Sequence, residues 1–190
     1  MLSFDASPTG PQRVTAQAMQ ALVPVLRTKR LTLRAPCLDD YAALKRIMEE
    51  PTARFMFDAM PSAIEGWLDF AQLTSGWLLR GHGPWAIEQD GEIRGFVSVH
   101  FEYGDKEPEL GFMLLPEAQG KGFAFEAAKA ARAYAFEALK MPTLVSYIDK
   151  ENTRSIALAE RLGGTRDSAA EAENGPSSYV YRYMNERVAA

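Results

Sequence analysis

Glu109-Leu-Gly-Phe-Met-Leu-Leu-Pro-Glu-Ala-Gln-Gly-Lys-Gly-Phe-Ala-Phe-Glu126 is the stretch that decides the fold. An apolar run ends at Pro116, a turn with two glycines follows at once, and an alanine-rich helical pattern then continues to about Leu139. A strand, a glycine turn and a helix start in this order favour binding of a phosphorylated ligand. The glycines let the backbone approach closely, and the free N–H groups of the first helical turn point toward the anion.

The turn itself, Gln119-Gly-Lys-Gly-Phe-Ala124, narrows the choice of phosphate ligand. It is not a P-loop, because Gly122 stands where Ser or Thr should hold magnesium, and it lacks the third glycine of a dinucleotide fingerprint at Phe125. It fits the pattern Gln/Arg-x-x-Gly-x-Gly/Ala and so resembles the pyrophosphate-binding loop of the GNAT acetyltransferase superfamily. The alternative is an ordinary strand–helix connection with flexible glycines.

A second block supports this resemblance. Asn152-Thr-Arg-Ser155, followed by Leu162-Gly163, resembles the Asn-x-x-Ser and Leu-Gly block of the branch that contains the ribosomal-protein N-acetyltransferases. By resemblance, Asn152 contacts the cofactor and Ser155 lies near its thiol; read from the residues alone, Asn152 is a helix N-cap and Ser155 belongs to the first turn. Many members carry a Tyr that protonates the leaving thiolate, and this chain has Ala159 there.

The resemblance implies acetyl-CoA as co-substrate, with no metal. The residues expected to bind it come from the strand end, the glycine turn and the second block: Met113, Leu114, Leu115, Gln119, Gly120, Lys121, Gly122, Phe123, Ala124, Asn152 and Ser155.

The resemblance also implies acyl transfer to an amine, which must lose a proton before it attacks the thioester. Backbone donors for the thioester oxygen are expected on the strand before the loop, with Leu114 at its centre. Glu109 is the candidate base, although a solvated strand-edge carboxylate is the alternative; for His100 a surface or strand-end position is favoured over a base role. Ser155, or a water, is the candidate acid in place of the missing Tyr.

Length and composition exclude several other classes of function. The length of 190 residues suits one domain, expected over 27–190, after a flexible arm over 1–26 with a short helix near 16–22. The net charge of −4 argues against nucleic-acid binding. One cysteine and two histidines give no metal cluster. No apolar run reaches the roughly 18 residues of a membrane span, and no secretory signal is evident, so a cytoplasmic protein is expected.

The element pattern predicts a mixed α+β fold. Strands are expected at 30–34, 84–88, 92–101, 109–115, 143–148 and 177–184, and helices at 40–49, 62–80, 120–139 and 152–162. This is the order of the GNAT fold, so the resemblance covers about 30–184 and implies a mostly antiparallel, twisted central sheet flanked by helices. The segment 165–176 is expected to be a charged, solvated loop.

The acceptor is left open: a protein N-terminal α-amine or a small-molecule amine. Its pocket is expected to involve aromatic side chains, with a core role as the alternative for the first two: Trp67, Trp77, Trp85, Phe55 and Phe57. Glu171 and Glu173 could attract a basic acceptor. The competing functions are a CoA-binding regulatory module without turnover, which Ala159 favours, and an antibiotic or polyamine acetyltransferase. The resemblance also allows a homodimer.

Overall fold

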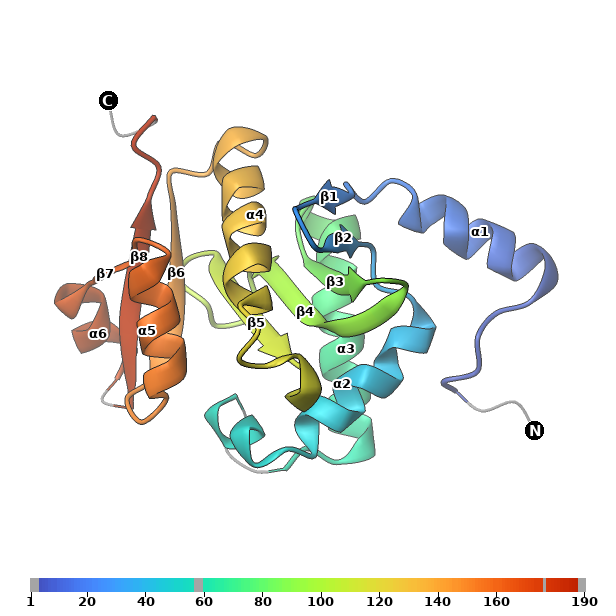
Figure 1. Ribbon diagram of the computed structural model, residues 1–190, viewed down its shortest axis with the longest axis horizontal. Helices are drawn as coiled ribbons and strands as arrows, with labels where there is room; N and C mark the ends of the chain where they lie inside the picture. Colours follow the sequence, from blue (N-terminus) through green and yellow to red (C-terminus); the bar gives the residue numbers. More distant parts are fainter. Residues whose placement is uncertain (1–3, 57–59, 176, 188–190) are drawn as a thin grey trace.

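The computed structural model describes residues 4–56, 60–175 and 177–187 (Figure 1). Its helices are α1 (Gly10–Gln20), α2 (Tyr41–Met48), α3 (Ala63–Arg80), α4 (Phe123–Glu137), α5 (Thr153–Arg161) and α6 (Ser168–Asn174). Its strands are β1 (Leu26–Arg27), β2 (Thr32–Arg34), β3 (Pro84–Gln89), β4 (Glu92–His100), β5 (Glu109–Leu114), β6 (Thr143–Asp149), β7 (Thr165–Arg166) and β8 (Ser178–Met184).

The strands of the described residues form one eight-stranded sheet in the order β1-β2-β3-β4-β5-β6-β8-β7. Every neighbouring pair is antiparallel except β5 and β6, which run parallel. The predicted fold class, a mostly antiparallel sheet flanked by helices, is therefore confirmed.

The parallel pair β5–β6 separates almost as soon as it begins. Its only paired position is Glu109 with Val145, and one further bond joins Val145 N–H to the Pro108 carbonyl at 3.0 Å. Beyond this point the two strands diverge, as Figure 1 shows. The sheet thus opens along the C-terminal half of β5.

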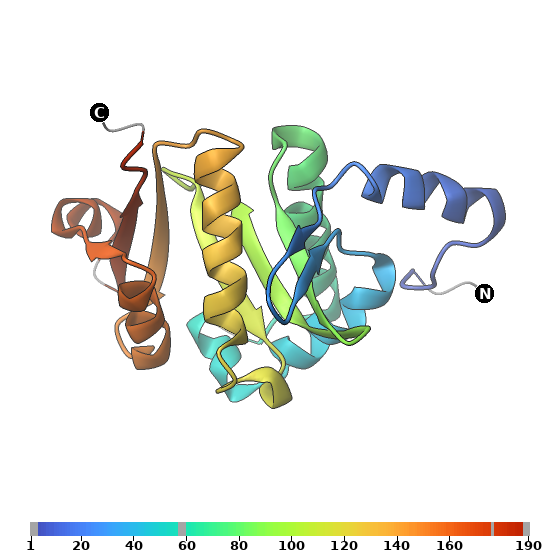
Figure 2. The ribbon, with the colours of Figure 1, turned by 45° about the horizontal axis from the view of Figure 1, so that its top comes forward.

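Helices cover both faces of this sheet. α4 and α5 lie on one face and α3 on the other, where α2 packs beside it (Figure 1). The buried face of α4 consists of small residues, so the helix can lie close against the strands. These residues, all fully buried, are Ala127, Ala128, Ala131 and Ala135. Figure 2 shows α1 projecting away from the rest of the molecule, and α1 buries none of its residues.

Local signals account for most element boundaries. The Ser62 hydroxyl accepts from Glu65 N–H, and the Glu65 carboxylate accepts from Ser62 N–H, so a capping box starts α3. Gly81, with φ 74°, ends it in the left-handed conformation. Asp90 and Gly91 take φ 54° and 80° in the β3–β4 hairpin, as an Asp-Gly turn requires.

Two expectations about the N-terminal segment need correction. The N-terminal helix runs from Gly10 to Gln20, earlier than expected, because Pro11 fits the first helical turn, and Leu26–Arg27 already joins the sheet as β1. Asp40 is the N-cap residue of α2, but its buried carboxylate makes no cap bond there; it accepts from Arg34 and from the Cys37 N–H.

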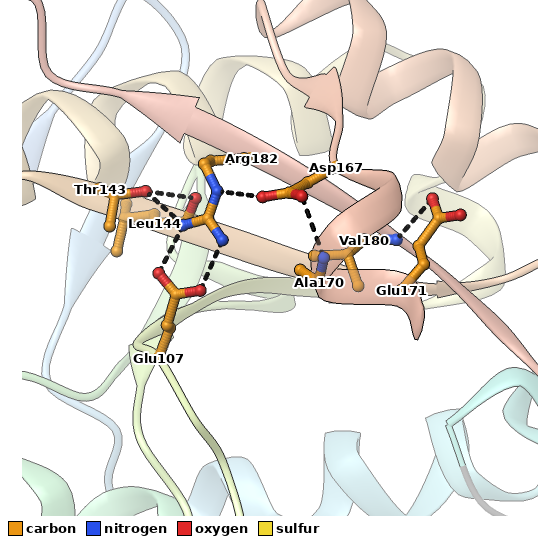
Figure 3. Close-up of polar contacts among 8 residues, drawn as sticks. All are labelled: Glu107, Thr143, Leu144, Asp167, Ala170, Glu171, Val180 and Arg182. Carbon is orange, nitrogen blue, oxygen red and sulfur yellow. Dashed lines mark hydrogen bonds and ion pairs between the residues drawn. The ribbon is translucent and has the colours of Figure 1, made fainter. Parts of the chain in front are cut away.

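The segment 165–176 is also not a loop as far as it is described. It forms β7 and α6, with Asp167 as N-cap of α6. Arg182 of β8 joins Asp167 to Glu107 in an ion-pair network, and Glu171 accepts a bond from Val180 N–H (Figure 3). Glu171 pairs with Arg166, and Glu173 pairs with Lys106.

Candidate functional site

A cleft of about 740 Å³ lies where β5 and β6 diverge. It is bounded by β5, β6, the turn before α4, the start of α5, and residues of α2 and α3. Of the site residues expected from the sequence, the cleft brings together Glu109, Met113, Leu114, Gln119, Gly120, Ala124, Asn152 and Ser155. Leu115, Lys121, Gly122 and Phe123 do not line it.

The hydrogen-bond pattern of β5 shows which backbone donors face this cleft. Leu115 N–H donates to the Arg94 carbonyl at 3.0 Å, so Arg94 and Leu115 form a hydrogen-bonded pair of the β4–β5 ladder. Because such pairs alternate along an antiparallel ladder, Met113 also turns its N–H toward β4, whereas Leu114 turns its N–H away from it. Of Met113, Leu114 and Leu115, therefore, Leu114 alone turns its N–H away from β4, toward the gap between β5 and β6. The N–H of Leu115 is already bonded to the Arg94 carbonyl.

The turn between β5 and α4 has the conformation that its glycines predict. Gly120 and Gly122 take φ 72° and 78°, and Gly122 is the N-cap of α4. The Gln119 amide donates to the Leu114 carbonyl at 3.2 Å, which ties the turn to the strand end. Lys121 is exposed on the turn, whereas the Phe123 ring is buried beneath it.

A side chain from the far end of the chain supports this turn. Arg30 donates to the Lys121 carbonyl at 2.9 Å, pairs with Glu126 at 2.7 Å, and lies over the Phe123 ring at 4.8 Å from its centre. Glu126 also accepts from Thr28 Oγ1 at 2.6 Å. The Glu126 carboxylate, in the first turn of α4, therefore anchors the β1–β2 turn to that helix.

The start of α5 forms the opposite wall of the cleft. Asn152 is the N-cap, and its side-chain oxygen accepts from Ser155 N–H at 3.2 Å, as the residue pattern alone indicated. Both residues also line the cleft. Ala159, which replaces the family's tyrosine, is fully buried one turn further on, so this position presents no side chain to the cleft.

His100 and Ser98 both line the cleft. Sequence reasoning favoured a surface or strand-end position for His100, which does end β4, and did not consider Ser98. The imidazole is only 15% exposed. Its Nδ1 lies 2.9 Å from Ser98 Oγ, and its Nε2 lies 3.5 Å from Oε2 of Glu109. The alternation of β4 was the available signal, because it places both residues on one face of the strand.

Carboxylates surround this histidine. Glu109 and Glu102 lie within 3.5 and 3.9 Å of His100 Nε2, and Asp69 of α3 lines the same cleft. Burial raises the pKa of Glu102, which the charge of His100 opposes, and burial together with the Glu65 charge raises the pKa of Asp69. This end of the cleft is therefore acidic and suited to a cation.

The aromatic side chains that were expected at the acceptor pocket do not all lie there. Phe55 lines the cleft. Trp67 and Trp77 pack against the hydrophobic core, and Trp85 is fully buried within it, with its Nε1–H donating to the Pro24 carbonyl. Phe57 lies outside the described residues. Core packing, the alternative considered for Trp67 and Trp77, is thus confirmed.

In the part of the chain that the structure describes, no helix has the length and apolar character to cross a bilayer.

Comparison with known proteins places this fold and site in context. Residues 30–165 match the profile of the acetyltransferase (GNAT) domain. An acetyltransferase from Agrobacterium tumefaciens str. C58 superposes with a TM-score of 0.80 and 38% identity, over 85% of this chain and 95% of that one. RimL, a ribosomal L7/L12 α-N-protein acetyltransferase solved with coenzyme A, shares the fold at a TM-score of 0.66 and 21% identity, over 85% and 98% of the two chains.

Curated relatives match over shorter segments. The spermidine N(1)-acetyltransferase of Escherichia coli K12 is 38% identical over 78 residues, 40% of this chain and 42% of that protein. The mycothiol acetyltransferase of Salinispora arenicola is 33% identical over 111 residues, 55% and 32% of the two chains. The chain therefore spans less than half the length of these relatives.

Proposed function

We propose that this chain, which belongs to the GNAT acetyltransferase family and is thus an acyltransferase, transfers the acetyl group of acetyl-CoA to a positively charged primary amine. One observation carries the proposal. The glycine turn at the start of α4, the outward N–H of Leu114 and the carboxylate of Glu109 open into one cleft. The acetyl donor, the N–H that stabilises the oxyanion and the base can therefore act together in this cleft.

The residues present fit acetyl-CoA. The turn Gln119–Ala124 and the N-terminus of α4 would bind its pyrophosphate, since a β-carbon at Gly120 would meet nothing within 4 Å and the backbone is open to an anion. Met113 and Leu114 would run beside its pantetheine arm. Asn152 and Ser155 would lie on its other side, nearer the thiol.

The chemistry is direct attack of the amine on the thioester. Glu109 accepts a proton from the ammonium group, and the neutral amine then attacks the carbonyl carbon. Leu114 N–H donates to the oxygen as it becomes an oxyanion. When the C–S bond breaks, a proton that originates on the amine nitrogen reaches the thiolate, with Ser155 as the candidate group to pass it.

The charge of the cleft supports a cationic acceptor. Asp69, Glu102 and Glu109 line the end where the amine would enter, and the two glutamates lie beside Nε2 of His100. The spermidine acetyltransferase among the relatives acts on such a cation. A polyamine or another small diamine is thus our first candidate, ahead of a protein α-amine.

A CoA-binding module without turnover is the second candidate, and Ala159 favours it because the family's tyrosine is missing. Release of free thiol from acetyl-CoA separates the two. We expect spermidine, putrescine or a lysine-containing peptide to stimulate release, and Glu109→Gln to reduce it by about 10²-fold. Glu92→Gln, an exposed carboxylate on β4, is the matched control. Binding of acetyl-CoA without release by any amine would contradict the enzyme proposal.

The cofactor assignment has its own test. Gly122→Val should abolish acetyl-CoA binding, because valine disfavours φ 78° and its side chain would approach Arg30. Gly91→Val imposes the same backbone strain at φ 80° in the β3–β4 hairpin, away from the cleft. Calorimetric titration should show binding lost in the first variant and kept in the second; equal affinities would remove the turn from the site.

A further inference from the structure

Ser98, His100 and Glu109 form a continuous polar chain that ends in the cleft. Ser98 and His100 occupy alternate positions on β4, and Glu109 is the residue of β5 paired with His100. The chain is joined by the 2.9 Å contact from Ser98 Oγ to His100 Nδ1 and the 3.5 Å contact from His100 Nε2 to Glu109. The imidazole is therefore held at both nitrogens.

The backbone of β5 leaves room for this arrangement at one glycine. Gly111 pairs with Ser98 across the ladder. A β-carbon at Gly111 would lie 2.8 Å from Ser98 Oγ and 3.0 Å from His100 Cε1. Any larger residue would push the hydroxyl or the ring from its place, so the glycine permits the contact between Ser98 and His100.

We propose that Glu109 and His100 form a proton relay, in which Glu109 takes the proton of the bound ammonium group and His100 Nε2 receives it from Glu109. This deepens the proposed function and rests on it. One N–H bond of the ammonium breaks and one N–H bond forms on the imidazole, while the Glu109 carboxylate is restored. Ser98 is a positioning residue: when its hydroxyl accepts from Nδ1–H, the tautomer of neutral His100 leaves Nε2 free to take the proton from Glu109.

The relay requires neutral imidazole, which gives it a pH dependence. Burial lowers the pKa of His100, but the hydrogen bond and charge of Glu109, with the charges of Glu102 and Asp105, outweigh burial and hold the pKa above its ordinary value. Asp69 of α3, Tyr147 of β6, Arg54 and Arg154 are further titratable groups among the described residues that line the cleft. Since the raised pKa belongs to a base that must lose its proton, kcat/KM should rise with pH through a midpoint above roughly 6.5.

The chain's two histidines make a direct measurement practical. Titration of the imidazole ring signals by NMR, in the absence of any acceptor, should show a raised midpoint for His100. That midpoint should fall in Glu109→Gln, whereas the signal of His82, buried against the Val99 carbonyl, should not respond. An unchanged His100 midpoint in Glu109→Gln would overturn the pairing and with it the relay.

Kinetics test the same relay in turnover. His100→Gln should lower kcat/KM for a diamine by about 10²-fold, remove the rise with pH, and leave acetyl-CoA affinity unchanged. Ser98→Ala should shift the midpoint with a smaller loss of rate, and Glu92→Gln should behave as wild type. A pH profile preserved in His100→Gln overturns the relay while leaving acetyl transfer intact. If wild-type protein releases no thiol with any amine, the proposed function fails and the relay fails with it.

Discussion

The guanidinium Nε of Arg30 lies 2.7 Å from Oε2 of Glu126, and this pair joins the turn between β1 and β2 to the first turn of α4. The same guanidinium donates to the Lys121 carbonyl within the glycine turn. Glu126 is further held by Thr28 Oγ1 and by Arg30 N–H. The turn is thus bonded to a side chain that precedes Lys121 by 91 residues.

Arg30→Ala should weaken acetyl-CoA binding without altering the acceptor site. Loss of a charge-assisted bond of about 1.5 kcal/mol to the turn corresponds to roughly a tenfold higher dissociation constant. KM for acetyl-CoA should rise while KM for the amine stays constant. Arg46→Ala, which removes an exposed pair with Glu117 beside the same turn, is the control and should change neither. Wild-type acetyl-CoA affinity in Arg30→Ala would show that the turn keeps its shape unaided.

Gly111→Ala should damage the acceptor half of the reaction selectively. The added methyl would lie 2.8 Å from Ser98 Oγ and 3.0 Å from His100 Cε1, so it crowds the imidazole as well as the hydroxyl, and displacement of the His100 ring by about 1 Å can cost 10²-fold in rate. We expect a loss of that size in kcat/KM for the amine, measured by thiol release. Acetyl-CoA affinity and the unfolding midpoint, determined on the same preparation, are the internal controls. A folded variant with full turnover would separate Ser98 and His100 from the chemistry.

The glycine turn and the main elements were predictable because their signals are local. Gly120 and Gly122 predict positive φ angles, Ser62 with Glu65 predicts a capping box, and Asp90-Gly91 predicts a hairpin turn. These residues interact with positions only a few places away, so the sequence displays both partners together. For the same reason Asn152 was readable as an N-cap.

What the sequence did not reveal depends on pairs that are distant along the chain. Nothing local links Arg30 to Glu126, or shows that Gly111 on the neighbouring strand leaves room for the contact between Ser98 and His100. The short helix α6 has no apolar periodicity; its order comes from the Asp167 cap and from contacts of Glu171 and Arg182. Such contacts appear only when the sheet order brings β5, β6 and β8 together.

Arg182→Met should destabilise the protein. Arg182 Nη2 lies 2.6 Å from Glu107 and its Nε 2.6 Å from Asp167, with about a fifth of the arginine side chain exposed (Figure 3). Removing charged bonds of this kind should lower the free energy of unfolding by about 2 kcal/mol, as measured by urea denaturation. Arg187→Met, which removes a largely exposed contact with Glu137, should change it by less than about 0.5 kcal/mol. Equal effects in the two variants would contradict a structural role for the network.

The same network predicts sensitivity to acid. The Ala170 N–H bond and Arg182 hold the pKa of Asp167 below its ordinary value. A carboxyl group with a lowered pKa stabilises the fold above its unfolded pKa, about 3.9, and this contribution is lost as the pH falls through the folded value. Wild-type protein should therefore lose more stability below pH 4 than Arg182→Met does. Parallel acid titrations followed by circular dichroism would test this, and identical curves would exclude it.

Substitutions of Asn152 can separate its two roles. Asn152 Oδ1 caps α5, and the residue also lines the cleft. Asn152→Ala should lose the cap and about 1 kcal/mol of stability, whereas Asn152→Ser and Asn152→Asp keep a capping oxygen and should stay near wild type. We expect both capped variants nevertheless to bind acetyl-CoA more weakly, because they lack the amide N–H groups, with the aspartate weaker still through repulsion of the phosphates. If Asn152→Ser binds acetyl-CoA as tightly as wild type, the side chain serves the helix alone.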